Sequence, residues 1–206
     1  MSGPVVIGIV GRKHHGKTTC ANMIARIYSG EVQSLAFADI LKSSLAILSG
    51  EPLSYYHDEV LKEEYSVAMG MSRRLAMQSF GDSVRNVFGE DFFISRLRHQ
   101  MRALNAKGKT VIFSDVRYCS EAEFIKKNGG ILLRVHRGSP TGHVVLEDDD
   151  DDIIPAADST DNHASETESD KIRCDIKINN TGSLKQMENI VSIAVSMAIT
   201  KRTMRI

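Results

Sequence analysis

An eight-residue segment with two glycines, Gly11 to Thr18, constrains the fold of this chain more than any other part of the sequence. It reads Gly-Arg-Lys-His-His-Gly-Lys-Thr and fills the pattern GxxxxGK(S/T). The residues before it, Val5–Val10, form the apolar, β-branched run of a buried strand, and residues 19–27 carry apolar side chains at helical spacing. We therefore predict a strand, a tight glycine turn and a helix in direct succession.

Such a strand, turn and helix create a binding site for phosphate groups. Backbone N–H groups of the turn converge on the anion, and the positive end of the helix dipole favours its charge. The ammonium of Lys17 can reach the β- and γ-phosphates, and the hydroxyl of Thr18 suits a Mg²⁺ ion. Because a strand and a helix flank the pattern, a chance match in a loop is disfavoured. The sequence predicts that ATP and Mg²⁺ bind at Gly11, Arg12, Lys13, His14, His15, Gly16, Lys17, Thr18 and Thr19.

The composition argues against several other classes of protein. Lys plus Arg and Asp plus Glu number 26 each, so the formal net charge is zero and no global basic field is present to hold a nucleic acid. No segment approaches the length of a membrane span, and the first apolar run lacks the basic start of a signal peptide. The 3 cysteines are far apart and fit reduced thiols. We expect a soluble, cytoplasmic protein that binds small molecules.

Apolar strand candidates alternate with helix candidates along the chain. This alternation is typical of an α/β fold in which helices cover both faces of a parallel sheet of about five strands. The predicted strands are 5–10, 32–37, 110–114, 130–136 and 172–178. The predicted helices are 18–29, 39–48, 71–88, 91–105, 120–128 and 183–200.

Two of these helices show a clear apolar stripe. In the helix at 91–105 the expected buried residues are Phe93, Leu97, Met101 and Leu104. The helix at 183–200 is expected to begin at a capping Ser183 and to bury Leu184, Met187, Val191, Ala194 and Ala198.

The stretch from Gly138 to Asp170 breaks the alternation. It contains a glycine-rich start, the five consecutive aspartates Asp148–Asp152 and a long polar segment. Such a composition cannot bury a core, so we expect a mobile surface loop or lid. The aspartates would either hold a divalent metal ion, restrain the lid, or, as we favour, form a solvated and self-repelling loop.

A second motif, Val111 to Arg117, reads as a buried strand that ends on an acid. At the carboxyl end of such a strand, Asp115 can orient a water molecule on Mg²⁺, or the phosphate group of a second substrate that accepts a phosphoryl group. The planar guanidinium of Arg117 can clamp an anion. The alternative is that Asp115 caps the helix starting near Ser120 and that Arg117 pairs with it. We favour the functional interpretation.

Between the first and third strands lies a set of side chains suited to binding anions: Lys42, Arg73, Arg74, Gln78 and Arg85. Each of them taken singly is more often a solvated surface residue. Arg134 and Arg137 precede the predicted lid and can swing onto a phosphoryl group in transfer, a reaction that depends on positioning and charge neutralisation. A phosphate acceptor is already anionic at neutral pH, so we interpret His14 and His15 as residues that shape the loop rather than as bases.

Taken in order along the chain, these residues resemble the deoxynucleoside monophosphate kinases of tailed phages. The shared motifs are Phe37-Ala38-Asp39-x-Leu41-Lys42, Gln78-x-x-Gly81-x-x-x-Arg85, Phe88-Gly89-x-Asp91-Phe92, Asp115-Val116-Arg117-x-x-x-Glu121, Gly129-Gly130, His163-Ala164-Ser165-Glu166 and Asp175-x-x-Ile178-x-Asn180-x-Gly182-Ser183-Leu184. Phe93 stands where that family often has Trp. Animal-type phosphomevalonate kinases share several of the motifs and are the nearest rival.

The resemblance implies the three-layer fold of P-loop nucleoside monophosphate kinases, with a core (1–37, 108–137 and 171–206), an acceptor-binding helical region (38–107) and a lid (138–170). It implies phosphoryl transfer from ATP to a deoxynucleoside monophosphate, in a monomer or homodimer, within the host cytoplasm if the chain is phage-encoded. By carry-over, Lys17 and Thr18 serve the ATP phosphates and Mg²⁺, Arg137 is a lid arginine, and Asn180 lies near the adenine or the loop. Together with Asp115, which we also expect to serve Mg²⁺, Lys17 and Arg137 are the expected catalytic residues. The acceptor would bind to Asp39, Lys42, Arg74, Gln78, Arg85 and Arg117. A phosphate-loop switch protein that hydrolyses ATP slowly remains the alternative from another class.

Overall fold

The computed structural model describes residues 5–28, 31–137, 144–146 and 164–203. The chain divides into two compact units, which we call the sheet unit (residues 1–36 and 98–206) and the helical unit (residues 37–97). Within the part of the chain that is described, no helix has both the length and the apolar character needed to cross a membrane.

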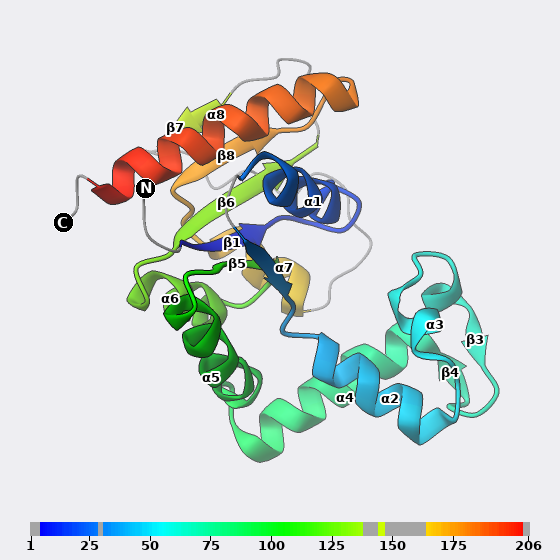
Figure 1. Ribbon diagram of the computed structural model, residues 1–206. Helices are drawn as coiled ribbons and strands as arrows, with labels where there is room; N and C mark the ends of the chain where they lie inside the picture. The colour runs from blue at the N-terminus through cyan, green and yellow to red at the C-terminus, as the bar shows by residue number, and fades with distance from the viewer. Residues whose placement is uncertain (1–4, 29–30, 138–143, 147–163, 204–206) are drawn as a thin grey trace. The chain divides into compact units, whose positions relative to one another are not determined.

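The sheet unit is built on one six-stranded sheet with the strand order β2-β5-β1-β6-β8-β7 (Figure 1). Five strands are parallel, and β7 pairs antiparallel with β8 at the edge. The strands are β1 (Val6–Val10), β2 (Val32–Leu35), β5 (Thr110–Val116), β6 (Ile131–His136), β7 (Val144–Leu146) and β8 (Ile176–Asn179). The predicted sheet of about five parallel strands is thus confirmed.

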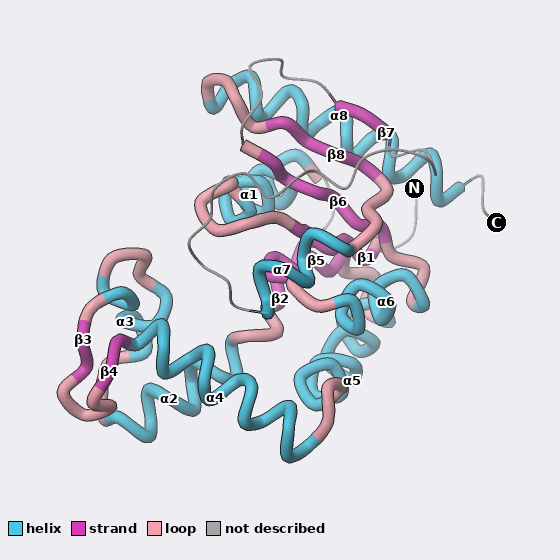
Figure 2. Tube along the Cα trace, turned by 180° about the vertical axis from the view of Figure 1, so that it is seen from behind, coloured by secondary structure: helices cyan, strands magenta, loops and turns pink. Residues whose placement is uncertain are grey.

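Helices cover both faces of this sheet, as predicted. On one face lie α1 (Lys17–Ile27) and α8 (Leu184–Thr203), and on the other lie α6 (Cys119–Lys127) and α7 (Ala164–Lys171) (Figures 1 and 2). Neither α7 nor β7 was predicted, and both fall inside the stretch expected to be a mobile loop or lid. The remainder of that stretch, including Asp148–Asp152, lies outside the described residues.

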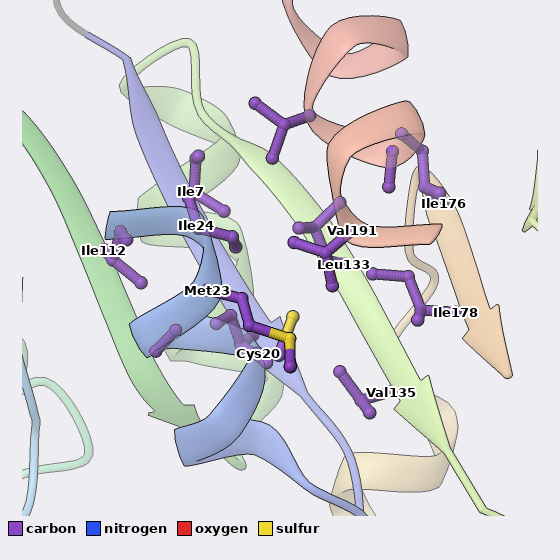
Figure 3. Close-up of a cluster of buried hydrophobic side chains, with 14 of the residues drawn as sticks. Ile7, Cys20, Met23, Ile24, Ile112, Leu133, Val135, Ile176, Ile178 and Val191 are labelled. Carbon is purple, nitrogen blue, oxygen red and sulfur yellow. The ribbon is translucent and has the colours of Figure 1, made fainter. Parts of the chain in front are cut away.

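The main core lies between the sheet and the pair α1 and α8. Side chains from β1, β6 and β8 pack there against Cys20, Met23 and Ile24 of α1 and against Val191 of α8 (Figure 3). All five residues of β1 are buried, because the strand has a neighbour on each side and helices over both faces. Each fully buried Ile or Leu side chain contributes about 2 kcal/mol relative to an exposed one. This packing makes β1 a rigid base for the segment that follows it.

The C-terminal helix begins as expected and buries a slightly different stripe. Ser183 Oγ accepts the N–H of Gln186 at 3.3 Å, and Gln186 Oε1 accepts the N–H of Ser183 at 2.7 Å, which is a reciprocal cap. Met187, Val191 and Ala194 are buried as predicted, whereas Leu184 is 70% exposed. The prediction was wrong for Leu184, which stands in the first turn of α8, before its buried stripe begins. The side chain of Ala198 lies outside the described residues.

The helical unit contains α2 (Asp39–Ser49), α3 (Leu53–His57), the 3₁₀ turn η1 (Leu61–Glu63), the short strands β3 (Tyr65–Ser66) and β4 (Met71–Ser72), and α4 (Arg73–Phe88). The helix α5 (Phe92–Ala106) begins in this unit and continues into the sheet unit. The stripe predicted for it is confirmed at Phe93 and Met101, whereas Leu97 and Leu104 are only half-buried and Ile94 is buried instead.

A small core and a buried ion pair hold the helical unit together. Leu45 and Ala46 of α2 form the core with Tyr56 of α3, and α2 packs against both α3 and α4. Beside it, Arg73 donates from Nε and Nη2 to the two oxygens of Glu51, at 2.9 and 2.7 Å. Tyr56 donates its hydroxyl to the same carboxylate at 3.0 Å. These bonds hold the pKa of Glu51 below its usual value, so the carboxylate stays charged while largely enclosed.

Candidate nucleotide-binding site

The segment Gly11–Thr18 forms a tight loop between the central strand β1 and the helix α1. We call it the phosphate loop. Gly11 has φ +152°, and Gly16 has φ +98° as the N-cap of α1. A Cβ atom at Gly11 would overlap the carbonyl oxygen of Val135, and one at Gly16 would lie 2.5 Å from Asn180 Nδ2. Both the backbone angles and the close neighbours therefore require glycine, which is the physical reason for the two fixed positions of the sequence pattern.

The start of α1 has the polarity that suits an anion. Among the described residues, no side chain caps this helix, and no acidic residue lies in its first turn. The first N–H groups of a helix have no partner within the helix, and they carry the positive end of its dipole. An anion at this position would satisfy both needs. The predicted phosphate site therefore has the backbone geometry that a phosphate group requires.

Lys17 is folded back over the loop. Its ammonium Nζ donates to the carbonyl oxygens of Gly11 at 2.6 Å and Arg12 at 2.7 Å. Thr18, the next residue, is exposed at the start of α1. The ammonium thus stands over the loop with its position fixed by two peptide groups, and a bound phosphate can compete for the same donor.

Four other predicted residues lie at the same edge of the sheet, because the carboxyl ends of parallel strands meet there. Asp115 is near the end of β5 and Arg117 follows it, Arg137 follows β6, and Asn180 follows β8. Arg137 is exposed. Asn180 Nδ2 donates to the carbonyl of His15 at 3.0 Å, so this residue lies against the phosphate loop.

A β-bulge sets the position of Asp115. Gly8 pairs with Phe113 and Val10 pairs with Val116, so Ser114 and Asp115 together oppose Ile9. An extra residue of this kind bends the strand and redirects a side chain. The strand was predicted to end at Ser114, but it continues through the bulge to Val116. Asp115 is half-buried at this bend, one strand away from the phosphate loop.

The helix after β5 is capped by a different acid from the one considered in the sequence. Glu121 Oε2 accepts the backbone N–H of Arg117 at 2.8 Å and that of Tyr118 at 3.1 Å. Glu121 is 3% exposed and lies in the first turn of α6. Glu121 therefore takes the capping role that the alternative interpretation gave to Asp115, and the pairing of Arg117 with Asp115 stays a prediction. Glu121 belongs to the motif noted in the sequence, but its buried capping role is seen only in the folded chain.

Two histidines meet at the side of the phosphate loop. The rings of His15 and His136 stand edge to face with their centres 5.1 Å apart. Burial and the nearby charges of His136 and Lys17 lower the pKa of His15 to about 4. Burial likewise lowers the pKa of His136, with Lys177 adding to the effect. A histidine with a pKa near 4 is neutral at pH 7 and a weak proton acceptor there, which agrees with the interpretation of His15 as a residue that shapes the loop.

Arg134 has a structural position, in contrast to the expectation that it swings onto a phosphoryl group. It is 9% exposed, and it donates to the carbonyl oxygens of Ser169 at 3.2 Å and of Ile172. These contacts fix it to the segment at the end of α7. Sequence reasoning also missed a partner of the phosphate loop: Arg12 donates to both carboxylate oxygens of Asp170, from Nε at 3.2 Å and from Nη2 at 2.6 Å. The two residues are 158 positions apart, so no local signal announces the pair.

The remaining predicted residues belong to the helical unit, and most of them have protein partners. Lys42 Nζ lies 3.3 Å from His57 Nδ1 and 3.8 Å from Asp39. Arg74 pairs with Glu63 at 2.5 Å. Gln78 is half-buried on α4, the helix that also carries Arg74 and Arg85.

Arg85 and Arg73, two further arginines of α4, differ in their contacts. Arg85 stacks its guanidinium 4.8 Å from the centre of the Phe93 ring and lies 3.9 Å from Glu90. Phe93 is 4% exposed, so its ring supports Arg85 rather than presenting a free face. Arg73, predicted as an anion-binding residue, is instead 6% exposed and held by Glu51.

The oxygen donors at the loop suit a hard divalent cation that arrives with a phosphate. Thr18 offers a hydroxyl and Asp115 a carboxylate, and Mg²⁺ commonly takes only one or two side chains together with substrate phosphates and water. Over the residues that the structure describes, no group of three or more His, Cys, Asp and Glu side chains gathers elsewhere to hold a metal ion. The donor set at the loop therefore fits Mg²⁺ carried by a triphosphate.

Comparisons with known proteins include a relative that aligns with most of the chain. No family model matches the chain. The chain is 29% identical over 209 residues to a protein of Acanthamoeba polyphaga mimivirus, in an alignment that covers 94% of this chain and 97% of the relative. That protein carries the name "Putative deoxynucleotide monophosphate kinase". The α/β architecture with five parallel strands is consistent with the fold expected for P-loop nucleoside monophosphate kinases.

Proposed function

We propose that this chain is a nucleotide kinase, and more specifically that it transfers the γ-phosphoryl group of ATP to a deoxynucleoside 5′-monophosphate. The observation that carries the proposal is the phosphate loop, which joins the central strand to an uncapped helix and holds Lys17 above its backbone. The name of the mimivirus relative and the motif order along the whole chain support the choice of a nucleotide kinase and of a deoxynucleotide acceptor.

The donor nucleotide would bind to the sheet unit. Backbone N–H groups of residues 11–18 surround the β- and γ-phosphates, and the dipole of α1 favours their charge. Lys17 exchanges its two carbonyl partners for phosphate oxygens and follows the charge that moves during transfer. Thr18 and Asp115 would hold Mg²⁺, which would neutralise part of the phosphate charge when bound. Asn180 would lie on the nucleoside side of the loop.

The acceptor monophosphate would be recognised by cationic and amide side chains. We propose Asp39, Lys42, Arg74, Gln78 and Arg85 from the helical unit, together with Arg117 after β5, for this role. A guanidinium binds a phosphate through two parallel hydrogen bonds, and an amide reads a base edge. The ion pairs that now hold Arg74 and Arg85 involve partly exposed acids, so a substrate phosphate can replace them at little cost.

The transfer itself needs positioning more than proton chemistry. One oxygen of the acceptor monophosphate attacks the γ-phosphorus, a new P–O bond forms, and the bond from the γ-phosphorus to the bridging oxygen of ADP breaks. The attacking oxygen is already anionic at pH 7, so no strong base is required. Lys17 and Arg137 would stabilise the charge on the equatorial oxygens, which is the main source of rate in phosphoryl transfer.

The proposal is tested by a panel of monophosphates. The purified chain is incubated with ATP, Mg²⁺ and each deoxynucleoside monophosphate, ribonucleoside monophosphate or phosphomevalonate, and ADP and the new diphosphate are separated by ion-exchange chromatography. We expect one or more deoxynucleoside diphosphates to form with an equal amount of ADP. Product from phosphomevalonate alone would replace the proposed acceptor class. Slow release of phosphate that no monophosphate stimulates would indicate an ATP-hydrolysing switch and would overturn the kinase assignment.

A further inference from the structure

Arg12 carries the first side chain of the phosphate loop, and its partner lies on a helix that is far away in the sequence. Arg12 is the residue directly after Gly11, and it holds the carboxylate of Asp170, in the last turn of α7, with two nitrogens of its planar fork. The side chains of Arg12 and Asp170 are only 18% and 27% exposed. We infer that Asp170 is a positioning residue for the phosphate loop, an inference that rests on the proposed binding of a triphosphate there.

Asp170 is itself held in place from the sheet. Arg134 extends from β6, on the face opposite the main core, and donates to the carbonyls of Ser169 and Ile172 on either side of the α7 end. Further along, Asp175 accepts the N–H of Leu132 at 2.9 Å. The end of α7 that carries Asp170 is thus attached to β6, the strand that pairs with β1 next to the loop.

The Arg12–Asp170 pair influences the position of Lys17. The side chain of Arg12 is fixed at its tip by Asp170, so the peptide groups on both sides of Arg12 are restrained. The carbonyl oxygens of these peptides, those of Gly11 and Arg12, are the two acceptors of the Lys17 ammonium. Before a triphosphate binds, Asp170 therefore restrains the lysine proposed to meet the β- and γ-phosphates, although its own carboxylate would be repelled by them.

The charge of Asp170 has a second consequence at the loop. Arg12, Lys17 and the neighbouring Arg134 are cations, and the electrostatic influence of Asp170 extends to His136, whose pKa it raises against the lowering effect of the cations. A carboxylate among these groups offsets their mutual repulsion while the site holds no anion. We expect its loss to release Arg12 and to let the loop relax away from the geometry that phosphate binding requires.

The test compares Asp170→Asn with a surface control. Asn keeps the shape of the side chain and removes its charge, and Glu123→Gln removes an exposed α6 acid that pairs with Lys127. Affinity for a non-hydrolysable ATP analogue with Mg²⁺ is measured by calorimetry, KM values by steady-state kinetics and Tm by calorimetric unfolding. We expect Asp170→Asn to bind the analogue about tenfold more weakly and to raise the KM for ATP while leaving that of the acceptor unchanged. Glu123→Gln should match the parent.

Two more variants separate positioning from a general effect on folding. Arg12→Lys keeps the charge but loses the fork, so it should weaken the analogue as much as Asp170→Asn does. The double variant should be no weaker than either single one, because both changes break the same link. The inference would be overturned if Asp170→Asn bound the analogue as tightly as the parent or more tightly, or if the losses in the double variant were additive. It would also be overturned if the loss in Asp170→Asn came with a lower Tm and affected both KM values. A parent protein that binds no triphosphate would instead refute the proposed function.

Discussion

The phosphate loop of the sheet unit and the helix α4 of the helical unit carry the two largest groups of predicted site residues, and they are built differently. The loop is made of backbone: two glycines, the first N–H groups of α1 and a lysine held by two carbonyls. On α4 the predicted residues act through long side chains, and acids hold the arginines. A site made of backbone is specified by a short local pattern, whereas a site made of arginines depends on which acids the fold brings to each one.

The difference also separates fixed groups from exchangeable ones. The loop dipoles are set by a buried strand and helix, so they need no reorganisation when phosphate binds. Arg74 and Arg85 contact Glu63 and Glu90, whose side chains are 42% and 67% exposed, and such pairs are weak and easily replaced. Arg73 pairs with the enclosed Glu51, and its loss would leave that carboxylate enclosed without its cationic partner. The predictions below test this division between fixed and exchangeable groups.

The largest effect is expected at the lysine of the loop. Replacing it in Lys17→Met should reduce kcat by about a thousandfold or more, because the moving charge loses its nearest cation. The melting temperature should remain close to that of the parent. Turnover is measured with the acceptor found in the monophosphate panel, and Lys127→Met, on a side chain that is 75% exposed, serves as the control. Full activity in Lys17→Met would remove the loop from the mechanism.

Adjacent arginines at the start of α4 sharpen the contrast between structural and exchangeable groups. Arg73→Ala should lower the free energy of unfolding by about 3 kcal/mol, because Glu51 is left enclosed without its partner. Arg74→Ala should cost less than about 1 kcal/mol of stability and should raise the KM for the acceptor. Denaturant unfolding and steady-state kinetics measure the two effects. Equal losses of stability in both variants would contradict the division drawn here.

Substitutions at Gly11 and Gly108 test whether close neighbours, and not only a positive φ, make glycine necessary in the loop. Gly11→Ala should cost about 2 to 3 kcal/mol and prevent triphosphate binding, because the new methyl group meets the Val135 carbonyl. Gly108→Ala has φ +76° with no atom within 4 Å of its Cβ, so it should cost only about 1 kcal/mol and leave binding intact. Urea unfolding and calorimetric titration distinguish these outcomes. If both variants bind the triphosphate equally well, close packing is not what restricts the loop.

The smallest effect concerns pH. The pKa of His15 is about 4 in the folded protein against 6.5 ordinarily, so the unfolded chain takes up a proton more readily between these values. Stability should therefore fall as pH is lowered from about 6.5 toward 4, and the lowered pKa values of His57 and His136 act in the same direction. In His15→Gln the fall in Tm between pH 7.5 and 5 should be smaller, by about 2 °C. An identical fall in both proteins would exclude His15 as a contributor.

The sequence specified the parts of this molecule that repeat or that act locally. Strands such as β1 and β6 are mainly apolar runs, and α8 has a capping residue and a stripe of apolar residues. Each of these elements can therefore be predicted from a few neighbouring residues. By contrast, β7 has three residues, β3 and β4 have two each, and α7 is polar after its first residue, Ala164. Segments so short or so polar have no apolar period for a pattern to report.

The candidate site divides in the same way. Gly11, Gly16 and Lys17 follow from the loop pattern, since their roles depend on their own backbone. The buried position of Arg134 and the Arg12–Asp170 pair depend on contacts between residues far apart in sequence, which only the folded chain reveals. Arg73 and Arg74 are neighbours of the same type, and tertiary partners alone make one structural and leave the other exchangeable.

The most direct test of the whole account follows the γ-phosphoryl group itself. ATP labelled with radioactive phosphorus at the γ position is mixed with excess protein, Mg²⁺ and the active monophosphate, and the products of a single turnover are separated. We expect the label to appear in the deoxynucleoside diphosphate at the rate at which ADP forms. Label that remains in ATP, or that passes only into inorganic phosphate, would contradict this expectation.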